Sequence, residues 1–185
     1  MSSIRRARIR FPAALALVLV LYCGCPVAAA EQGPAEQRVL ERFLGAWETQ
    51  ATIHNLTPTT GEHTTHGKGV CRATLLGRYF EFCTESDSNR QADLQVMTYD
   101  SQIRVFRQWV FSSDGYYHEA QGAWNASTAT LRWEGKTDRG SFVVEDHWVS
   151  PDRLDWTLRR TDAKGNVTRV IDGSLRRVKA ATENK

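Results

Sequence analysis

Apolar and polar residues alternate along most of the chain from residue 46 to residue 177, which is the pattern of half-buried β-strands. In the first segment Trp47, Ala51 and Ile53 share one face, and polar residues occupy the other. Short stretches rich in glycine, aspartate, serine and proline separate the segments and favour tight turns. The pattern predicts ten strands, at residues 46–54, 65–74, 79–86, 93–99, 103–111, 116–124, 129–135, 141–149, 153–161 and 166–177.

A short helix is predicted just before the first strand. Val39, Leu40, Phe43 and Leu44 recur at helical spacing, and Gly45 ends the pattern. We expect this helix to pack its apolar stripe against the strands that follow.

Ten short strands joined by tight turns define an all-β fold. Parallel strands need long crossover connections, and the sequence leaves no room for them between consecutive strands. Ten strands in series also exceed what an open twisted sheet holds without curling or splitting. The first choice is therefore an antiparallel up-and-down barrel, and the second is a sandwich of two packed sheets.

The first thirty residues differ from the rest. Four arginines among the first ten residues precede an apolar run at 11–22, and small residues follow at 27–30. This order is typical of a secretory signal, and the run is shorter than the roughly 20 residues of a membrane-spanning helix. We expect residues 1–30 to be a signal peptide and residues 31–185 to form one barrel domain, exported to the periplasm or secreted. A lipid anchor at Cys25 is an alternative.

The charge balance changes once the signal is set aside. The whole chain has 24 Lys and Arg against 21 Asp and Glu. Four of the basic residues and none of the acidic ones precede residue 31, so 20 basic and 21 acidic residues remain, a net charge of −1. Nucleic-acid binding and general attraction to anionic membranes therefore lose their main support.

Several short motifs resemble a known group of barrels. Phe43-Leu44-Gly45-Ala46-Trp47-Glu48 resembles the Gly-x-Trp start of lipocalin-like barrels. Other segments are similar to an uncharacterised family of exported bacterial proteins, a domain of unknown function with a calycin-type barrel. These segments are Leu76-Gly77-Arg78-Tyr79-Phe80-Glu81, Tyr99-Asp100, Arg107-Gln108-Trp109, Ser113-Asp114-Gly115 and Asp152-Arg153-Leu154-Asp155-Trp156. The resemblance implies a closed lipocalin-like barrel with an internal cavity, and it assigns no functional residues.

Aromatic and charged residues are predicted to share the interior of this barrel. Aromatic rings line ligand cavities, although they can also simply fill a lumen. Arg107, His118, Asp146 and Arg160 fall in the same alternating register, and buried charges need each other, water or a ligand. A ligand bound by these aromatic and charged residues would be small, partly apolar and anionic. The predicted ligand-binding residues are Arg107, Trp109, Tyr116, His118, Trp124, Trp133, Asp146, Trp148 and Trp156. Two alternatives are an internal salt-bridge network without a ligand and a one-residue register error that turns the charges to solvent.

Cys71 and Cys83 are the two cysteines that remain after the signal. If residues 75–79 form a hairpin tip, the paired positions sum to 153 or 154, which sets the two cysteines opposite or nearly so. We expect a disulfide in an oxidising compartment, with two buried free thiols as the alternative.

Signatures of catalysis are weak. The sequence has no Gly-x-Ser-x-Gly elbow and no phosphate-binding glycine loop, and no third ligand accompanies His63 and His66 to form a metal site. No cofactor or metal is expected. The preferred function is binding of a small molecule in the lumen, without enzymatic activity. A filled barrel acting through its outer surface is the second hypothesis, and an acid–base enzyme using Asp146 and His118 is the third.

Overall fold

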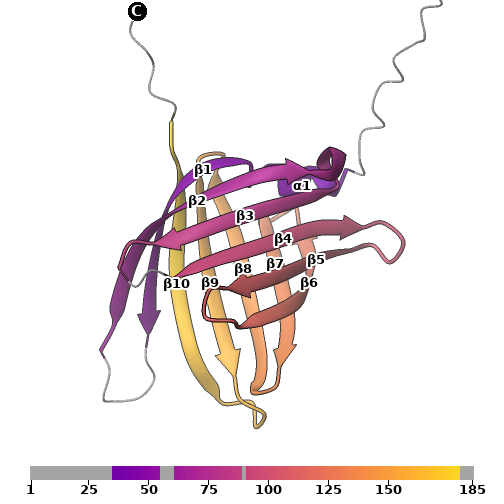
Figure 1. Ribbon diagram of the computed structural model, residues 1–185. Coiled ribbons are helices and arrows are strands. Elements are labelled where there is room, and N and C mark those ends of the chain that lie inside the picture. The colour runs from indigo at the N-terminus through magenta and orange to yellow at the C-terminus, as the bar shows by residue number, and fades with distance from the viewer. Residues whose placement is uncertain (1–34, 55–60, 89–90, 180–185) are drawn as a thin grey trace, which may run out of the picture. The chain divides into compact units, whose positions relative to one another are not determined.

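The computed structural model describes residues 35–54, 61–88 and 91–179. These residues form one short helix, a 3-10 turn and ten β-strands (Figure 1). In chain order they are α1 (Gln37–Glu41), β1 (Gly45–His54), β2 (His63–Thr74), the 3-10 turn (Leu75–Gly77), β3 (Tyr79–Ser86), β4 (Ala92–Asp100), β5 (Val105–Ser112), β6 (Tyr117–Asn125), β7 (Thr130–Thr137), β8 (Gly140–Ser150), β9 (Arg153–Thr161) and β10 (Val167–Arg177). The predicted signal segment and Cys25 lie outside the described residues.

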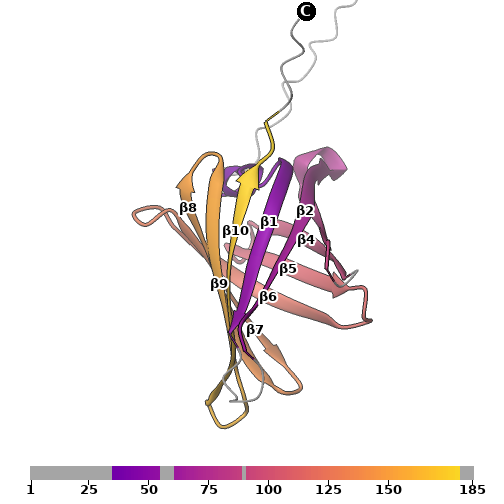
Figure 2. The same cartoon turned by 90° about the vertical axis from the view of Figure 1, so that its left-hand side faces the viewer.

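The strands form a closed barrel in which each strand pairs with its neighbours in sequence. The sheet closes where β1 pairs with β10, from Trp47 opposite Arg177 to His54 opposite Val170. Figure 2 shows this seam, with β1 lying between β10 and β2. Closure gives every described strand partners on both sides and removes free sheet edges. The predicted all-β, antiparallel up-and-down barrel with one short helix is confirmed.

The barrel has two different ends. The α1 end carries the helix and the turns at 75–78, 101–104, 126–129 and 151–152, and the far end carries the turns at 113–116, 138–139 and 162–166.

The most tightly packed part of the core lies at the α1 end. Val39, Leu40 and Phe43 are buried, as the helical pattern predicts, and Leu44 is half-buried. A helix of five residues has little stability of its own, so α1 depends on this packing. The fully buried strand side chains around it are Trp47, Phe80, Met97, Leu131, Trp133 and Leu154.

The turns at the two ends also differ in backbone conformation. The far end uses Gly115, Gly140 and Gly165 at its positive-φ positions. At the α1 end, positive φ falls on Gly45 and Gly77 and also on four residues that carry side chains: Leu75 (47°), Leu76 (59°), Arg104 (57°) and Ala129 (49°). The left-handed conformation costs an L-residue about 1–2 kcal/mol.

The predicted inward orientation of Arg107 and Trp109 is wrong. In β5 the interior residues are Phe106 and Gln108, both buried, so Arg107 and Trp109 lie on the outer wall. There the Arg107 guanidinium forms an ion pair with Glu119 at 2.6 Å and lies 5.3 Å from the centre of the Trp109 ring. Successive strand residues face opposite sides, so a one-residue difference in register moves the whole set.

The predicted disulfide is also corrected. The register between β2 and β3 sets Cys71 opposite Phe82 and Val70 opposite Cys83. Cys71 therefore points into the barrel and Cys83 points outward, and both thiols are free. The residue numbers of each β2–β3 pair add up to 153. Cys71 and Cys83 add up to 154, so they would face each other only if the pairing shifted by one residue. Burial raises the pKa of Cys71 to about 12, so its thiol is unreactive at neutral pH.

Candidate functional site

The interior of the barrel changes from packed to accessible along its axis. Leu131 and Trp133 at the α1 end have no exposed surface. Towards the far end the interior side chains Trp156, Leu158 and Arg160 of β9 are all half-buried. These interior side chains keep part of their surface exposed, so the interior of the barrel is accessible towards its far end.

Two aromatic rings lie against the inner wall of this half. Phe142 and Trp156 stand opposite Gly135 and Gly173 in the neighbouring strands. A Cβ atom at either glycine would collide with the ring beside it. The rings thus occupy the space that glycine leaves on the wall and form an apolar lining there.

A polar cluster occupies the same half of the lumen. The Arg160 guanidinium lies 5.6 Å from the centre of the Tyr116 ring, and His118 is 5.7 Å from that ring. On its other side His118 meets Phe142 edge-on, with 4.6 Å between ring centroids. Asp93 of β4 is close enough for its charge to act on His118. One cation, one carboxylate and one imidazole therefore meet among aromatic rings. They come from β9, β4 and β6, and the rings come from β8 and from the turn before β6.

Three atoms of this cluster form no hydrogen bond within the described protein: Asp93 Oδ1, His118 Nδ1 and Arg160 Nε. Arg160 also has no ion pair among the described residues, although it is half-buried. A buried polar atom without a partner costs roughly 1–3 kcal/mol. These three atoms are themselves buried, so each carries an unmet hydrogen-bonding capacity inside the barrel.

The cation of the cluster is Arg160 rather than His118. Burial and the Arg160 charge lower the pKa of His118 to about 4, against a smaller opposing effect of Asp93. His118 is therefore neutral at pH 7 and offers one donor and one acceptor nitrogen.

Asp146 lies deeper and has a different partner. Trp133 Nε1 donates a hydrogen bond of 2.8 Å to Asp146 Oδ2 in the buried core. Burial raises the pKa of Asp146 to about 7, although the Trp133 hydrogen bond favours the charged form. Asp146 and His118 have different partners: Trp133 binds Asp146, whereas His118 packs against Tyr116 and Phe142.

The predicted site residues thus fall into separate groups. Tyr116 and His118 join Arg160 in the far half, whereas Trp156 stands opposite Asp146 and Gly173 in the neighbouring strands. Trp133 and Asp146 form a pair in the core, and Trp124 and Trp148 contact each other near α1 at 5.7 Å. Arg107 and Trp109 lie outside. Asp93 was not predicted, because its neighbours Leu94 and Val96 are apolar and suggest the opposite face as the interior one.

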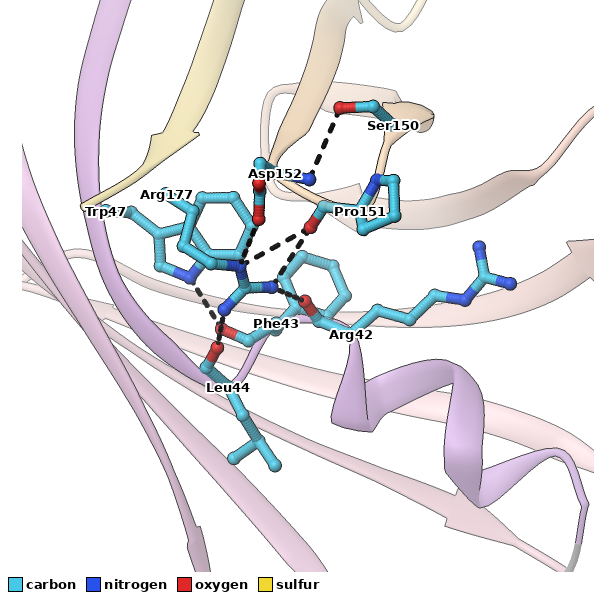
Figure 3. A network of polar contacts seen from close by, with 8 residues as sticks. All are labelled: Arg42, Phe43, Leu44, Trp47, Ser150, Pro151, Asp152 and Arg177. Carbon is cyan, nitrogen blue, oxygen red and sulfur yellow. Dashed lines mark hydrogen bonds and ion pairs between the residues drawn. The ribbon is translucent and has the colours of Figure 1, made fainter. Parts of the chain in front are cut away.

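The α1 end is closed by Arg177 of β10 (Figure 3). Its guanidinium donates hydrogen bonds to the carbonyl oxygens of Leu44, Arg42 and Pro151, the last two at 3.0 and 3.2 Å. It also pairs with Asp152 at 3.2 Å and lies 4.2 Å from the centre of the Trp47 ring. One side chain therefore joins the helix, the start of β1 and the turn between β8 and β9.

Two hollows lie outside the lumen. A cavity of about 420 Å³ beside the Arg177 network is lined by Arg42, Trp148, Ser150, Pro151 and Arg177. A wider groove of about 1030 Å³ runs over the outer wall of β6, β7 and β8, where Arg132 is paired with Glu134 and Glu145. Because the charges along this groove are largely paired with each other, they give a weaker indication of a ligand than the lumen does.

No group of three metal-ligating side chains occurs among the residues that the structure describes. In the same part of the chain, no helix has the length and hydrophobicity needed to cross a membrane.

The fold and the site together define a lipocalin-like barrel, closed at one end by a helix and accessible at the other. No family model matches the sequence, and no curated protein matches it.

Comparison with solved structures supports this class. The chain is similar to Rv2717c of M. tuberculosis, with 11% identity and a TM-score of 0.58 over 79% of this chain and 99% of that one. It is similar to the S-type phycobiliprotein lyase CPES of Guillardia theta, with 12% identity and a TM-score of 0.58 over 80% and 95% of the two chains. A protein of unknown function from the DUF3598 family of Nostoc punctiforme matches with 12% identity and a TM-score of 0.50 over 75% and 49%. At these identities the likeness shows the fold, and the predicted calycin-type barrel is confirmed at that level.

Proposed function

We propose that the far half of the lumen binds a small, partly apolar molecule that carries an anionic group. The observation that carries this proposal is Arg160, a half-buried cation that forms no ion pair with any described residue and lies against the Tyr116 ring. A cation removed from water gains most from a counter-ion that is also removed from water.

The rest of the ligand would lie on the apolar wall. Phe142 and Trp156 line it on one side, and Leu158 and Ile171 face the interior nearby. His118 is neutral at pH 7 and does not compete with Arg160 for the charge.

We further propose that the protein acts outside the cytoplasm, in the periplasm or the medium, with residues 1–30 serving as its signal peptide. The order of basic, apolar and small residues in that segment supports this. The intact mass of the protein from its own cells should then correspond to a chain that begins near residue 31.

Two fluorescent probes that differ in one group test the role of Arg160. 1-Anilinonaphthalene-8-sulfonate carries a sulfonate, and N-phenyl-1-naphthylamine is its neutral counterpart. Arg160→Gln should weaken binding of the sulfonate at least about tenfold, which is the effect of losing one charge-assisted hydrogen bond. Binding of the neutral probe should change less than about twofold.

The matched control is Arg159→Gln, because Arg159 is exposed on the outer wall of the same strand. This variant should bind both probes as the wild type does. Equal loss of the sulfonate probe in the two variants, or no binding of either probe by the wild type, would refute lumen binding.

A further inference from the structure

The α1 end exposes aliphatic side chains at two neighbouring hairpin tips. Leu75 and Leu76, between β2 and β3, are 71% and 106% exposed, and Ile103, between β4 and β5, is 59% exposed. Strands β3 and β4 pair, and Thr98 Oγ1 donates a hydrogen bond of 2.8 Å to the Arg78 carbonyl near the tips. Figure 1 shows both tips projecting on the same side of the barrel. We name Leu75, Leu76 and Ile103 the apolar tips.

The backbone at these tips does not suit the residues it carries. Leu75 and Leu76 both have positive φ, a conformation that glycine or asparagine takes at lower cost. Leu76 is fully exposed and so gains no burial in the fold to offset this strain. Gly77 in the same turn, like the glycines in the turns of the far end, takes positive φ without this cost. Exposed leucine in a strained turn is therefore best explained by a contact outside the chain.

Two arginines flank the apolar tips. Arg78 and Arg104 are exposed and form no ion pair with any described residue. The nearest acidic residue in the β4–β5 turn, Asp100, uses its carboxylate to accept hydrogen bonds from the backbone N–H groups of Gln102 and Ile103. The tips thus combine aliphatic side chains with cations that are free to meet an anion.

We propose that these two hairpin tips dock on a phospholipid surface. The aliphatic side chains enter the boundary between headgroups and acyl chains, and Arg78 and Arg104 contact lipid phosphates. The net charge of −1 outside residues 1–30 gives no long-range attraction, so attachment rests on these local contacts. The far end, where the lumen is accessible, then lies away from the lipid. This inference does not depend on lumen binding.

Cosedimentation with vesicles of phosphatidylcholine and phosphatidylglycerol tests the proposal. The protein is isolated from expressing cells, and all variants share the same N-terminus. Leu75→Asn/Leu76→Asn should lower the vesicle partition coefficient at least about tenfold, because two aliphatic contacts are lost. Its melting temperature should stay unchanged or rise, since asparagine tolerates the left-handed conformation. Arg78→Gln/Arg104→Gln should lower partition as well and reduce its dependence on salt.

The control is Phe111→Ser/Tyr117→Ser, which removes an exposed stacked aromatic pair from the outer wall near the far end. This variant should partition as the wild type does. The proposal is overturned if the wild type does not bind vesicles, if the asparagine variant partitions unchanged, or if the control loses as much as the asparagine variant. A rise in stability together with a loss of lipid binding is a result that a purely structural role for the leucines would not produce.

Discussion

At the residue scale, Asp146 and His118 have pKa values displaced in opposite directions. Burial raises the pKa of Asp146 from 3.8 to about 7, and burial together with Arg160 lowers that of His118 from 6.5 to about 4. Between about pH 4 and 7 the folded chain holds a proton on Asp146 that the unfolded chain has lost. Between about pH 4 and 6.5 the folded chain lacks a proton on His118 that the unfolded chain holds. With rising pH, Asp146 therefore lowers the free energy of unfolding and His118 raises it.

Removing either group should expose the effect of the other. In Asp146→Asn the free energy of unfolding should rise with pH between about 4 and 6.5, by up to about 1.4 kcal/mol per pH unit. In His118→Gln it should fall between about pH 4 and 7 with a similar slope. The wild type should vary less than either variant. Urea unfolding at constant ionic strength measures these slopes, and flat profiles in both variants would contradict the assignment.

At the scale of elements, Arg177 joins parts of the chain that the strand ladder does not connect. It satisfies carbonyl groups at the end of α1 and in the turn between β8 and β9, and its own strand closes the barrel against β1. Replacing it leaves several of these acceptors without a donor.

Arg177→Met keeps the aliphatic stem but removes the guanidinium. We expect a loss of about 2–3 kcal/mol in the free energy of unfolding, from the unpaired acceptors and the lost Asp152 pair. Arg176→Met is the control, because Arg176 is exposed on the outer wall; it should change stability by less than about 0.5 kcal/mol. Chemical denaturation compares them, and equal stability of the two variants would show that the Arg177 network contributes little.

The elements also show how far the sequence could predict the structure. Alternation and turn residues were sufficient to locate ten strands, since these signals are local. For β5 the predicted strand began at 103, but residues 101–104 form a turn in which Arg104 has positive φ. Both faces of β5 carry aromatic residues, Phe106 inside and Trp109 outside, so its inward face is decided by pairing with β4 and β6.

The candidate site was predictable only in part for the same reason. His118 and Tyr116 were found because they continue an aromatic register. The proximity of Asp93 and Arg160 to them depends on how distant strands meet around the barrel, which no local pattern encodes. A shift of one residue in the pairing of β2 with β3 likewise decides whether Cys71 and Cys83 could form a disulfide.

At the scale of the whole barrel, the two ends suit different tasks. The α1 end is packed and tied together by Arg177, and it exposes the apolar tips. The far end leaves Arg160 and Trp156 half-buried around an accessible lumen. A barrel docked on lipid through one end would keep the other end available to a ligand from solution.

The central claim is that the lumen holds an anionic guest through Arg160. Native mass spectrometry of the protein purified from its own cells tests it most directly. We expect a bound small molecule with an acidic group on the wild type and on Arg159→Gln, and its loss from Arg160→Gln. An unliganded wild-type barrel, or a guest retained equally by Arg160→Gln, would contradict the claim.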